Sequence, residues 1–442
     1  MRLLSQALVA ALALSLGACD LLPDWFGAPE KPPLPGERIS ILELDVAPMA
    51  DPELSDLDVR LPRPILNADW PQSGGDAHHA MQHLEASGAL ARVWTTSIGQ
   101  GVSDERRMPA GPVSAGGRVF ALDTEGNVAA VRADNGERLW RVNVVPENED
   151  NEAFGGGIAF GDGVLFVTTG AGEVVALNPV SSGEYWRVSV GAPIRAAPTY
   201  SNGRVFVVSY DNRLHALDGS DGSILWTHSG VAEIAQLLQA ASPAVASGLV
   251  VAAFSSGEIY ALRVENGRQI WSDSLSFGGQ YGPLASLGDI NGHPVIDEDL
   301  VYAVSHAGRM VAMALRSGER LWEQDVASVQ TPWIAGDFIY VLSSDGAVLC
   351  LSRIDGLIRW VRALPRYEDA EERDGAIFWS GPLLVSDRLI VVGSNGDALS
   401  ISPYSGRFLG RIVLPGDVEL SPIAANGMVY ILTNDGDLVA LR

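Results

Sequence analysis

Short runs of apolar residues separated by polar turns recur along most of the chain. The stretch 198–226 (PTYSNGRVFVVSYDNRLHALDGSDGSILW) shows the unit, with breaks at Asn202-Gly203, Asp211-Asn212 and Asp221-Gly222. These dipeptides tolerate the positive φ angles that tight hairpins need. The pattern therefore predicts four short antiparallel strands that form one sheet.

The second predicted strand of this unit does not alternate apolar with polar residues. Its run Val205-Phe206-Val207-Val208 is apolar on both faces of a strand. A sheet covered on one side only would leave half of these side chains in water. We therefore expect each sheet to lie between two neighbouring sheets, which the repeats supply.

Tryptophan marks the last strand of the repeat. The marker falls at Trp94, Trp140, Trp186, Trp226, Trp271, Trp322 and Trp360, with gaps of 46, 46, 40, 45, 51 and 38 residues. These gaps are in the range of propeller blades. The next marker is due near Gly410, where the repeat has no tryptophan.

The two ends of the repeat region complement each other. The stretch 90–97 is a last strand without the three before it, whereas the C-terminus has three strands without a fourth. Pairing them completes an eighth sheet and leaves no open end. The sequence thus predicts an all-β, eight-bladed β-propeller of four-stranded antiparallel blades, closed by pairing the N-terminal strand with the C-terminal three strands.

The first residues resemble a bacterial lipoprotein signal. An apolar run from Ala7 to Leu16 is too short to span a bilayer and precedes Leu16-Gly17-Ala18-Cys19. This box predicts a signal peptide over 1–18 and lipidation of Cys19. The alternative is an ordinary secretory signal with an incidental cysteine.

Composition separates a tether from the repeat region. Residues 19–67 are rich in proline and acidic residues, which predicts an extended tether, and we assign 68–442 to the propeller. The net charge of −24 disfavours nucleic acid or an anionic membrane surface as a partner. Cys350, in an apolar run, is expected to be a small core residue.

Candidate catalytic chemistry is sparse. His78, His79 and His83 invite a metal site, but no carboxylate or thiol completes a ligand set, and a polar loop beside the domain explains them equally well. The sequence has no Gly-x-Ser-x-Gly elbow, P-loop, His-Glu-x-x-His or Cys-x-x-Cys motif. We therefore predict neither a catalytic residue nor a metal site.

The repeat itself resembles a known family. The form AL(D/N)xxxGxxxW, seen from Ala216 to Trp226, is similar to the pyrroloquinoline-quinone-type propeller repeat and covers roughly Leu90 to Arg442. The enzymes of that type, the quinoprotein dehydrogenases, bind a flat quinone and calcium and typically have adjacent cysteines. This chain has no adjacent cysteines, and its tryptophans occupy the outer position of the repeat. The resemblance therefore leaves a quinoprotein dehydrogenase as an alternative, while we expect no enzyme and no cofactor.

Lipidation signal, tether and eight blades together resemble the BamB family of lipoproteins of the bacterial β-barrel assembly (BAM) machinery. This resemblance implies a non-enzymatic scaffold that is lipid-anchored on the periplasmic face of the outer membrane. It also implies binding to the POTRA domains of BamA, contact with other BAM subunits and a role toward nascent outer membrane proteins. An envelope scaffold for another partner is a further alternative. Asp20, directly after Cys19, resembles the inner-membrane retention signal of enteric bacteria and leaves the choice of membrane open.

The resemblance also implies which residues contact the partner. In the BamB family two neighbouring loops carry the contact, and here they match Leu237-Leu238 and the turn from Leu287 to Asn291. Leu237, Leu238, Asp289 and Asn291 are the expected partner-binding residues. Leu238 stands where the family has arginine and Asn291 where it has aspartate, so no ion pair is expected at these two positions.

Overall fold

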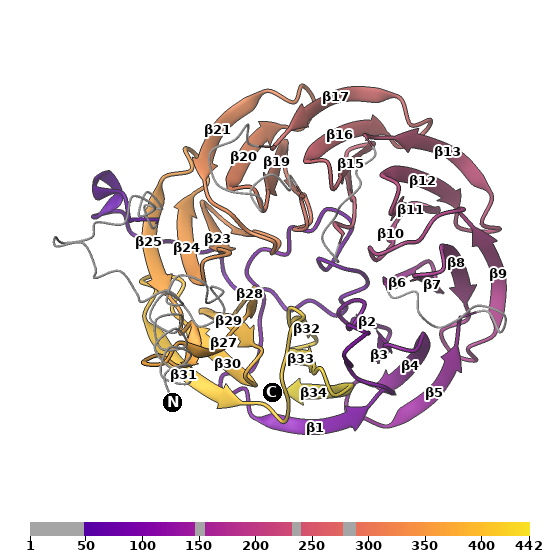
Figure 1. The fold of residues 1–442 in the computed structure, drawn as a ribbon, viewed down its shortest axis with the longest axis horizontal. Helices are drawn as coiled ribbons and strands as arrows, with labels where there is room; N and C mark the ends of the chain where they lie inside the picture. The colour runs from indigo at the N-terminus through magenta and orange to yellow at the C-terminus, as the bar shows by residue number, and fades with distance from the viewer. Residues whose placement is uncertain (1–47, 146–154, 232–239, 277–288) are drawn as a thin grey trace, which may run out of the picture. The chain divides into compact units, whose positions relative to one another are not determined.

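The computed structural model describes residues 48–145, 155–231, 240–276 and 289–442. In this part of the chain, eight four-stranded antiparallel sheets are arranged as a ring (Figure 1). The predicted eight-bladed β-propeller is confirmed. We number the blades 1 to 8 in chain order.

The strands run from the axis outward in each blade. Blades 1 and 2 contain β2 (Val113–Ala115), β3 (Arg118–Leu122), β4 (Asn127–Arg132) and β5 (Arg138–Asn143), then β6 (Gly156–Gly161), β7 (Val164–Thr169), β8 (Glu173–Leu177) and β9 (Glu184–Ser189). Blades 3 and 4 contain β10 (Thr199–Ser201), β11 (Arg204–Ser209), β12 (Arg213–Asp218) and β13 (Ile224–Ser229), then β14 (Ala244–Ala246), β15 (Leu249–Ala253), β16 (Glu258–Arg263) and β17 (Gln269–Ser274). Blades 5 and 6 contain β18 (Val295–Asp297), β19 (Leu300–Val304), β20 (Arg309–Ala314) and β21 (Arg320–Asp325), then β22 (Trp333–Ala335), β23 (Phe338–Leu342), β24 (Ala347–Ser352) and β25 (Ile358–Ala363). Blade 7 contains β28 (Trp379–Val385), β29 (Arg388–Gly393), β30 (Asp397–Ile401) and β31 (Phe408–Val413).

Blade 8 closes the ring with strands from both ends of the repeat region. It contains β32 (Ile423–Ala425), β33 (Met428–Leu432), β34 (Asp437–Leu441) and, as its outer strand, β1 (Arg92–Ser97). Thr95 pairs with Val439, and the backbones of Ala91 and Arg442 exchange two hydrogen bonds of 2.7 and 2.8 Å. The predicted closure is therefore confirmed.

The repeat tryptophans join each blade to the next one. Every marker indole donates its N–H to a backbone carbonyl of the following blade, at 2.7–3.1 Å. The pairs are Trp94 with Ala133, Trp140 with Pro179, Trp186 with Gly219, Trp226 with Val264, Trp271 with Leu315, Trp322 with Arg353 and Trp360 with Pro403. A large side chain that also satisfies its polar atom is well suited to this position between sheets.

Blade 7 lacks its tryptophan for a structural reason. In blade 1 and in blades 3 to 7, the third and fourth strands are joined by a turn whose glycine packs against the tryptophan of the preceding blade, as Gly318 does against Trp271. In blade 2 the turn glycine, Gly183, makes no such contact. In blade 8 the corresponding strands, β34 and β1, come from opposite ends of the repeat region and no such turn joins them. Gly410 occupies the tryptophan position of β31, and a Cβ there would meet nothing within 4 Å.

The core consists of strands that are apolar on both faces, as the sequence indicates. Val205, Phe206 and Val207 are fully buried, and Cys350 lies in β24 with no exposed surface. Burial raises the pKa of the Cys350 thiol, so this side chain is an inert core residue as expected.

In the described residues, a 3₁₀-helix and a two-stranded hairpin lie outside the blades. The 3₁₀-helix η3 (Pro52–Leu54) lies in a segment held against β25, since the Asp51 N–H donates to the carbonyl of Ile358 at 2.7 Å and Arg359 donates to the carbonyl of Leu57. Although composition groups these residues with the tether, the compact unit begins at Pro48. The acidic stretch after blade 6 forms a hairpin of β26 (Tyr367–Asp369) and β27 (Asp374–Ala376).

Residues 67–87, which we name the axial segment, cross the centre of the ring (Figure 1). This segment hydrogen-bonds to every blade, at or directly after the first strand. The bonds join Asn67 to Asn426, Trp70 to Ser114, Pro71 to Phe160, Gln72 to Tyr200, Ala77 to Val245, His78 to Ile296, Gln82 to Gly336, Leu84 to Ser386 and Ser87 to Gly427. The axial segment therefore covers the centre of the ring at the end where the first strands finish.

Candidate functional site

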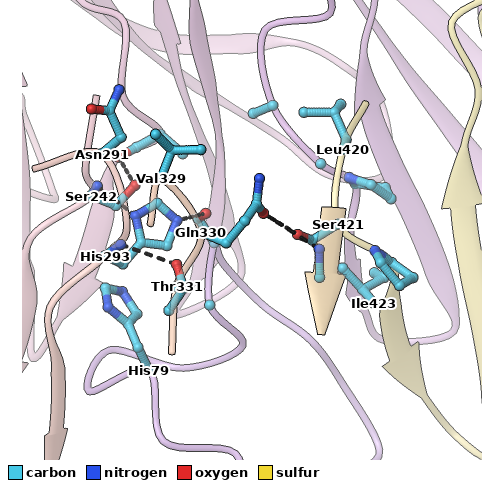
Figure 2. A pocket seen from close by; sticks show the side chains of 18 of the residues that line it. His79, Ser242, Asn291, His293, Val329, Gln330, Thr331, Leu420, Ser421 and Ile423 are labelled. Carbon is cyan, nitrogen blue, oxygen red and sulfur yellow. Dashed lines mark hydrogen bonds between the residues drawn. The ribbon is translucent and has the colours of Figure 1, made fainter. Parts of the chain in front are cut away.

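An axial cavity lies above the axial segment, at the end where the first strands of the blades begin. Its volume is about 160 Å³. Trp70, Ser73, Gly74 and His79 of the axial segment line it together with residues that precede the first strands, such as Ala110, His293, Gln330 and Ser421. Figure 2 shows His293 between Ser242 and Thr331, and Gln330 reaching toward Ser421.

The hydrogen bonds of His293 fix which ring nitrogen carries the proton. The backbone N–H of Ser242 donates to His293 Nδ1 at 2.9 Å, so Nδ1 carries no proton in the neutral ring. The other nitrogen, Nε2, then carries the proton and donates it to Ser73 Oγ at 2.7 Å. Burial lowers the pKa of His293 to about 4, so this neutral form predominates at pH 7.

His79 packs beside His293, with 5.1 Å between the ring centroids. Its Nδ1 lies 2.8 Å from the carbonyl of Pro294, and because a carbonyl only accepts, this nitrogen carries the proton. Burial lowers the pKa of His79 to about 3. His79 Nε2 is therefore a bare acceptor, and it has no hydrogen-bond partner within the described residues.

This arrangement opposes nucleophilic catalysis by Ser73. A serine nucleophile must give its proton to a histidine that accepts it. Here His293 donates to Ser73, and the N–H of Ser242 holds the ring in that tautomer. The Ser73–His293 pair is consequently a structural hydrogen bond.

The cavity also fits a quinone with calcium poorly. Its volume matches one six-membered ring, since cavities of about 150 Å³ hold benzene, whereas a pyrroloquinoline quinone has three fused rings. Of the side chains that line it, Glu419 is the one carboxylate, and nowhere in the described ranges do three His, Cys, Asp or Glu side chains gather. Calcium prefers six to eight oxygen ligands, which this wall does not provide.

The three histidines singled out in the sequence each have a separate structural partner. His78 Nε2 lies 2.9 Å from Asp76, and this hydrogen bond raises the pKa of His78. His83 Nδ1 donates to the carbonyl of Pro62, and its Nε2 accepts the N–H of Asp387. All three belong to the axial segment, so the polar-loop interpretation accounts for them.

Only two of the predicted partner-binding residues lie in the described part of the chain. Asp289 and Asn291 precede β18 on the cavity side of the ring, and they are 2% and 7% exposed. Leu237, Leu238 and the lipidation residue Cys19 lie outside the described residues.

A second, smaller cavity brings the bases of the two predicted contact loops together. Ala240, which follows the first loop, and Asp289 and Asn291, which end the second, line the same cavity of about 20 Å³. Beside them the guanidinium of Arg195 lies 4.2 Å from the ring centroid of Tyr210. Loops that are separate in the sequence thus arise at one place between blades 3, 4 and 5.

Sequence reasoning missed the axial cavity. Its main polar residues, His293, Gln330 and Ser421, come from different blades and belong to no motif. The available signal was Trp70-Pro71 beside a histidine-rich stretch just before the first repeat, which marks a non-repeating segment but does not show where it packs.

Within the described residues, no helix has the length and apolar character needed to cross a bilayer.

Comparison with known proteins gives consistent results. A family model described as outer membrane protein assembly factor BamB matches residues 124–362, more than half of the chain. The protein of that name from Yersinia pestis is 28% identical over 356 residues, which cover 79% of this chain and 88% of the relative. The one from Escherichia coli strain K12 is 26% identical over 353 residues, with the same coverage.

Solved structures of two functional classes share the fold. BamB from Moraxella catarrhalis matches with a TM-score of 0.66 and 19% identity, over 80% of this chain and 100% of that one. A europium-containing methanol dehydrogenase matches with a TM-score of 0.66 and 14% identity, over 85% and 89%. At these identities both likenesses concern the fold alone. The family model decides between the two classes, and the chain belongs to the outer membrane protein assembly factor BamB family.

Proposed function

We propose that this protein is a non-enzymatic scaffold of the β-barrel assembly machinery that assists the assembly of outer membrane proteins. Membership of the BamB family is the observation that carries this proposal, since the relatives are named as assembly factors. A rigid ring that displays loops on one face is a suitable platform for binding another protein. The partner that we propose is the POTRA region of a BamA-like protein, together with other BAM subunits.

The proposed location is the periplasmic face of the outer membrane, with lipid on Cys19 as the anchor. The box Leu16-Gly17-Ala18-Cys19 supports this proposal. Several acyl chains on one residue would hold the protein on the membrane stably. Palmitate labelling of the wild-type chain and of Cys19→Ala tests the anchor, and equal labelling of the two proteins would refute it.

The proposed contact surface is formed by the two loops that arise beside Ala240 and Asn291. Asp289 is almost fully buried, so we assign it the role of holding the base of the second loop. Direct contact is then expected from Leu237 and Leu238. A few side chains packed at the centre of an interface commonly carry most of its binding energy.

Co-purification tests this surface. Leu237→Asp should lower capture of a BamA-like partner from detergent-solubilised membranes by about tenfold or more, because it places a charge in an apolar contact. Leu321→Asp is the matched control, since Leu321 is 53% exposed on the outer strand β21. Asp289→Arg is unsuitable because it would place a cation in a buried site. Equal capture of the wild type and Leu237→Asp would exclude the proposed surface.

The alternative enzyme has a direct test of its own. Pyrroloquinoline quinone with calcium is titrated into the purified protein, and reduction of a dye is followed with an alcohol or a sugar. The scaffold proposal expects neither stoichiometric quinone binding nor turnover. Turnover that depends on the quinone would refute the scaffold proposal and show that the protein is a dehydrogenase.

A further inference from the structure

The axial cavity has the dimensions of a binding site for one small ring. Its volume of about 160 Å³ is close to the roughly 150 Å³ at which protein cavities hold a benzene ring. The axial segment closes one end, so a ligand would enter from the side on which the first strands begin. Residues from most of the blades meet there, which makes the wall rigid.

One side of the cavity is aromatic and apolar. Trp70 and Trp333 stack with 6.2 Å between ring centroids and an angle of 20° between planes. The indole N–H of Trp333 donates to the carbonyl of Gln82, which fixes the orientation of this ring. The remaining apolar lining comes from alanines, valine, leucine, isoleucine and several prolines. Such a surface favours a flat or apolar ring.

Three polar side chains of the cavity wall have a hydrogen-bond donor or acceptor that no described residue satisfies. Ser73 Oγ accepts from His293, so its own hydrogen is available, and the described residues offer no acceptor for it. Gln330 Oε1 accepts from Ser421 and from the N–H of Gly381, while its Nε2 has no acceptor in the described part of the chain. His79 Nε2 is the complementary group, a buried acceptor without a donor.

The unsatisfied donors and acceptor of the wall indicate which substituent a bound ring should carry. A hydroxyl group matches both kinds of wall group, because it can accept a hydrogen bond from Ser73 or Gln330 and can donate one to His79 Nε2. A purely apolar ring would leave these groups unsatisfied, which costs binding energy. The wall holds one acidic side chain, Glu419, and one basic side chain, Arg195, so together with the net charge of −24 it has no excess of positive charge that would favour an anion.

We propose that the axial cavity binds a single aromatic ring that carries a hydroxyl group, the chemistry of a phenol or of a tyrosine side chain. The ring lies against Trp333, and the hydroxyl lies among Ser73, Gln330 and His79. The ligand comes either from a free small phenol or from a tyrosine presented by another polypeptide. The axial cavity adjoins the base of the proposed contact surface, since Ala240 and Asn291 also line it, but none of the residues that we assign to ligand binding belongs to the contact loops.

Titration of the full chain tests the proposal. p-Cresol is followed by saturation-transfer NMR and calorimetry, with toluene and methyl glucoside as comparison ligands. p-Cresol should bind with one site per chain, at least about fivefold more tightly than toluene, because one neutral hydrogen bond contributes up to a factor of about ten. A capped Gly-Tyr-Gly peptide distinguishes the two sources of the ligand. If the peptide binds more tightly than p-cresol, the ligand is a tyrosine of another polypeptide, and if it binds more weakly, the ligand is a free phenol.

Three variants locate the site. Gln330→Met and Ser73→Ala should each weaken p-cresol binding about five- to tenfold, and Ala110→Trp should abolish it by filling the cavity. Ser181→Ala, at an exposed position outside the cavity, is the control, and thermal unfolding checks that each variant is folded. No binding of p-cresol, equal affinity for toluene, preference for methyl glucoside, or affinities unchanged in Gln330→Met and Ser73→Ala would each overturn the proposal.

Discussion

At the scale of single residues, the contact between Trp271 and Gly318 shows why the repeat has its sequence form. Gly318 has a φ of 73°, and a Cβ at this position would lie 2.7 Å from the indole ring of Trp271. Glycine therefore serves two purposes, the left-handed turn and the close approach of the tryptophan from the preceding blade. The sequence motif describes an interface between two blades.

Gly318→Ala should destabilise the protein more than Gly163→Ala. Gly163 has a φ of 78°, but a Cβ there would meet nothing within 4 Å, so its substitution costs only the backbone strain. The difference in free energy of unfolding should be about 1–3 kcal/mol, the cost of overpacking. Thermal or denaturant unfolding of the two variants measures it, and equal destabilisation would contradict the interblade role of Gly318.

The neutral state of His293 predicts a loss of stability in acid. In the unfolded chain this histidine titrates near pH 6.5, whereas burial lowers its pKa to about 4 in the folded protein. Between these values the unfolded state binds more protons, so the free energy of unfolding falls as the pH falls from about 6.5 toward 4. His293 should contribute about 2 kcal/mol of this loss at pH 5.

The variant His293→Gln should lose that part of the pH dependence, as seen in melting temperatures at pH 7.5 and 5. His78→Gln is the opposite control, because the hydrogen bond with Asp76 raises the pKa of His78 and makes its protonation stabilising. A pH profile of His293→Gln that parallels the wild type would refute the assignment.

At the scale of elements, the axial segment holds the inner ends of all eight blades. Its only regular structure consists of isolated bridges, such as those of Leu84 with Ile65 and Val385. Its stability therefore comes from burial and from bonds to the first strands. Leu84 is fully buried among residues of blades 7 and 8.

Leu84→Ala should lower the free energy of unfolding by about 2–5 kcal/mol, the range for large-to-small substitutions in a core. Glu85→Ala, at the exposed neighbouring position, should change it by less than about 0.5 kcal/mol. Denaturant unfolding of both variants makes the comparison. A small effect at Leu84 would mean that the axial segment contributes little to the ring.

The elements differ in how well the sequence predicts them. Hairpins such as Asn202-Gly203 are encoded by adjacent residues, and the tryptophan recurs at a fixed place in every unit except blade 7, so both can be identified from the chain. The axial segment occurs once in the chain. Its residues Asn67, Trp70 and Leu84 make hydrogen bonds to blades that lie far away in the sequence, so no local pattern shows their role. The axial cavity was unpredictable for the same reason, because Gln330 of blade 6 and Ser421 of blade 8 meet only across the axis of the assembled ring.

At the scale of the whole molecule, the ring is held shut by non-covalent pairing of β1 with β34. Val439 is fully buried in β34, between β1 and β33, and pairs with both. The pairing of β1 with β34 joins the two ends of the repeat region, and we call it the seam of the propeller. Its loss would expose the edges of blade 8 to solvent.

Val439→Pro should open this seam, because proline removes a ladder hydrogen bond and clashes inside a central strand, at about 3 kcal/mol or more. Val413→Pro is the control, since Val413 is 71% exposed at the end of the outer strand β31. Limited proteolysis should cleave the first variant in the β1 region and spare the second. Equal resistance would contradict the seam as the weak point.

The same seam has a consequence for the time course of folding. Thr95 of β1 must find Val439, so nearly the whole ring is synthesised between the two partners. Contacts of such long sequence separation form slowly, because the entropy of closing the loop is lost before the contacts form. Individual blades can fold early from local hairpins, but β1 and the axial segment that precedes it have to wait for the last three strands. During that interval a newly made chain exposes one unpaired strand and an open axis, and this is the period in which it is most prone to aggregate.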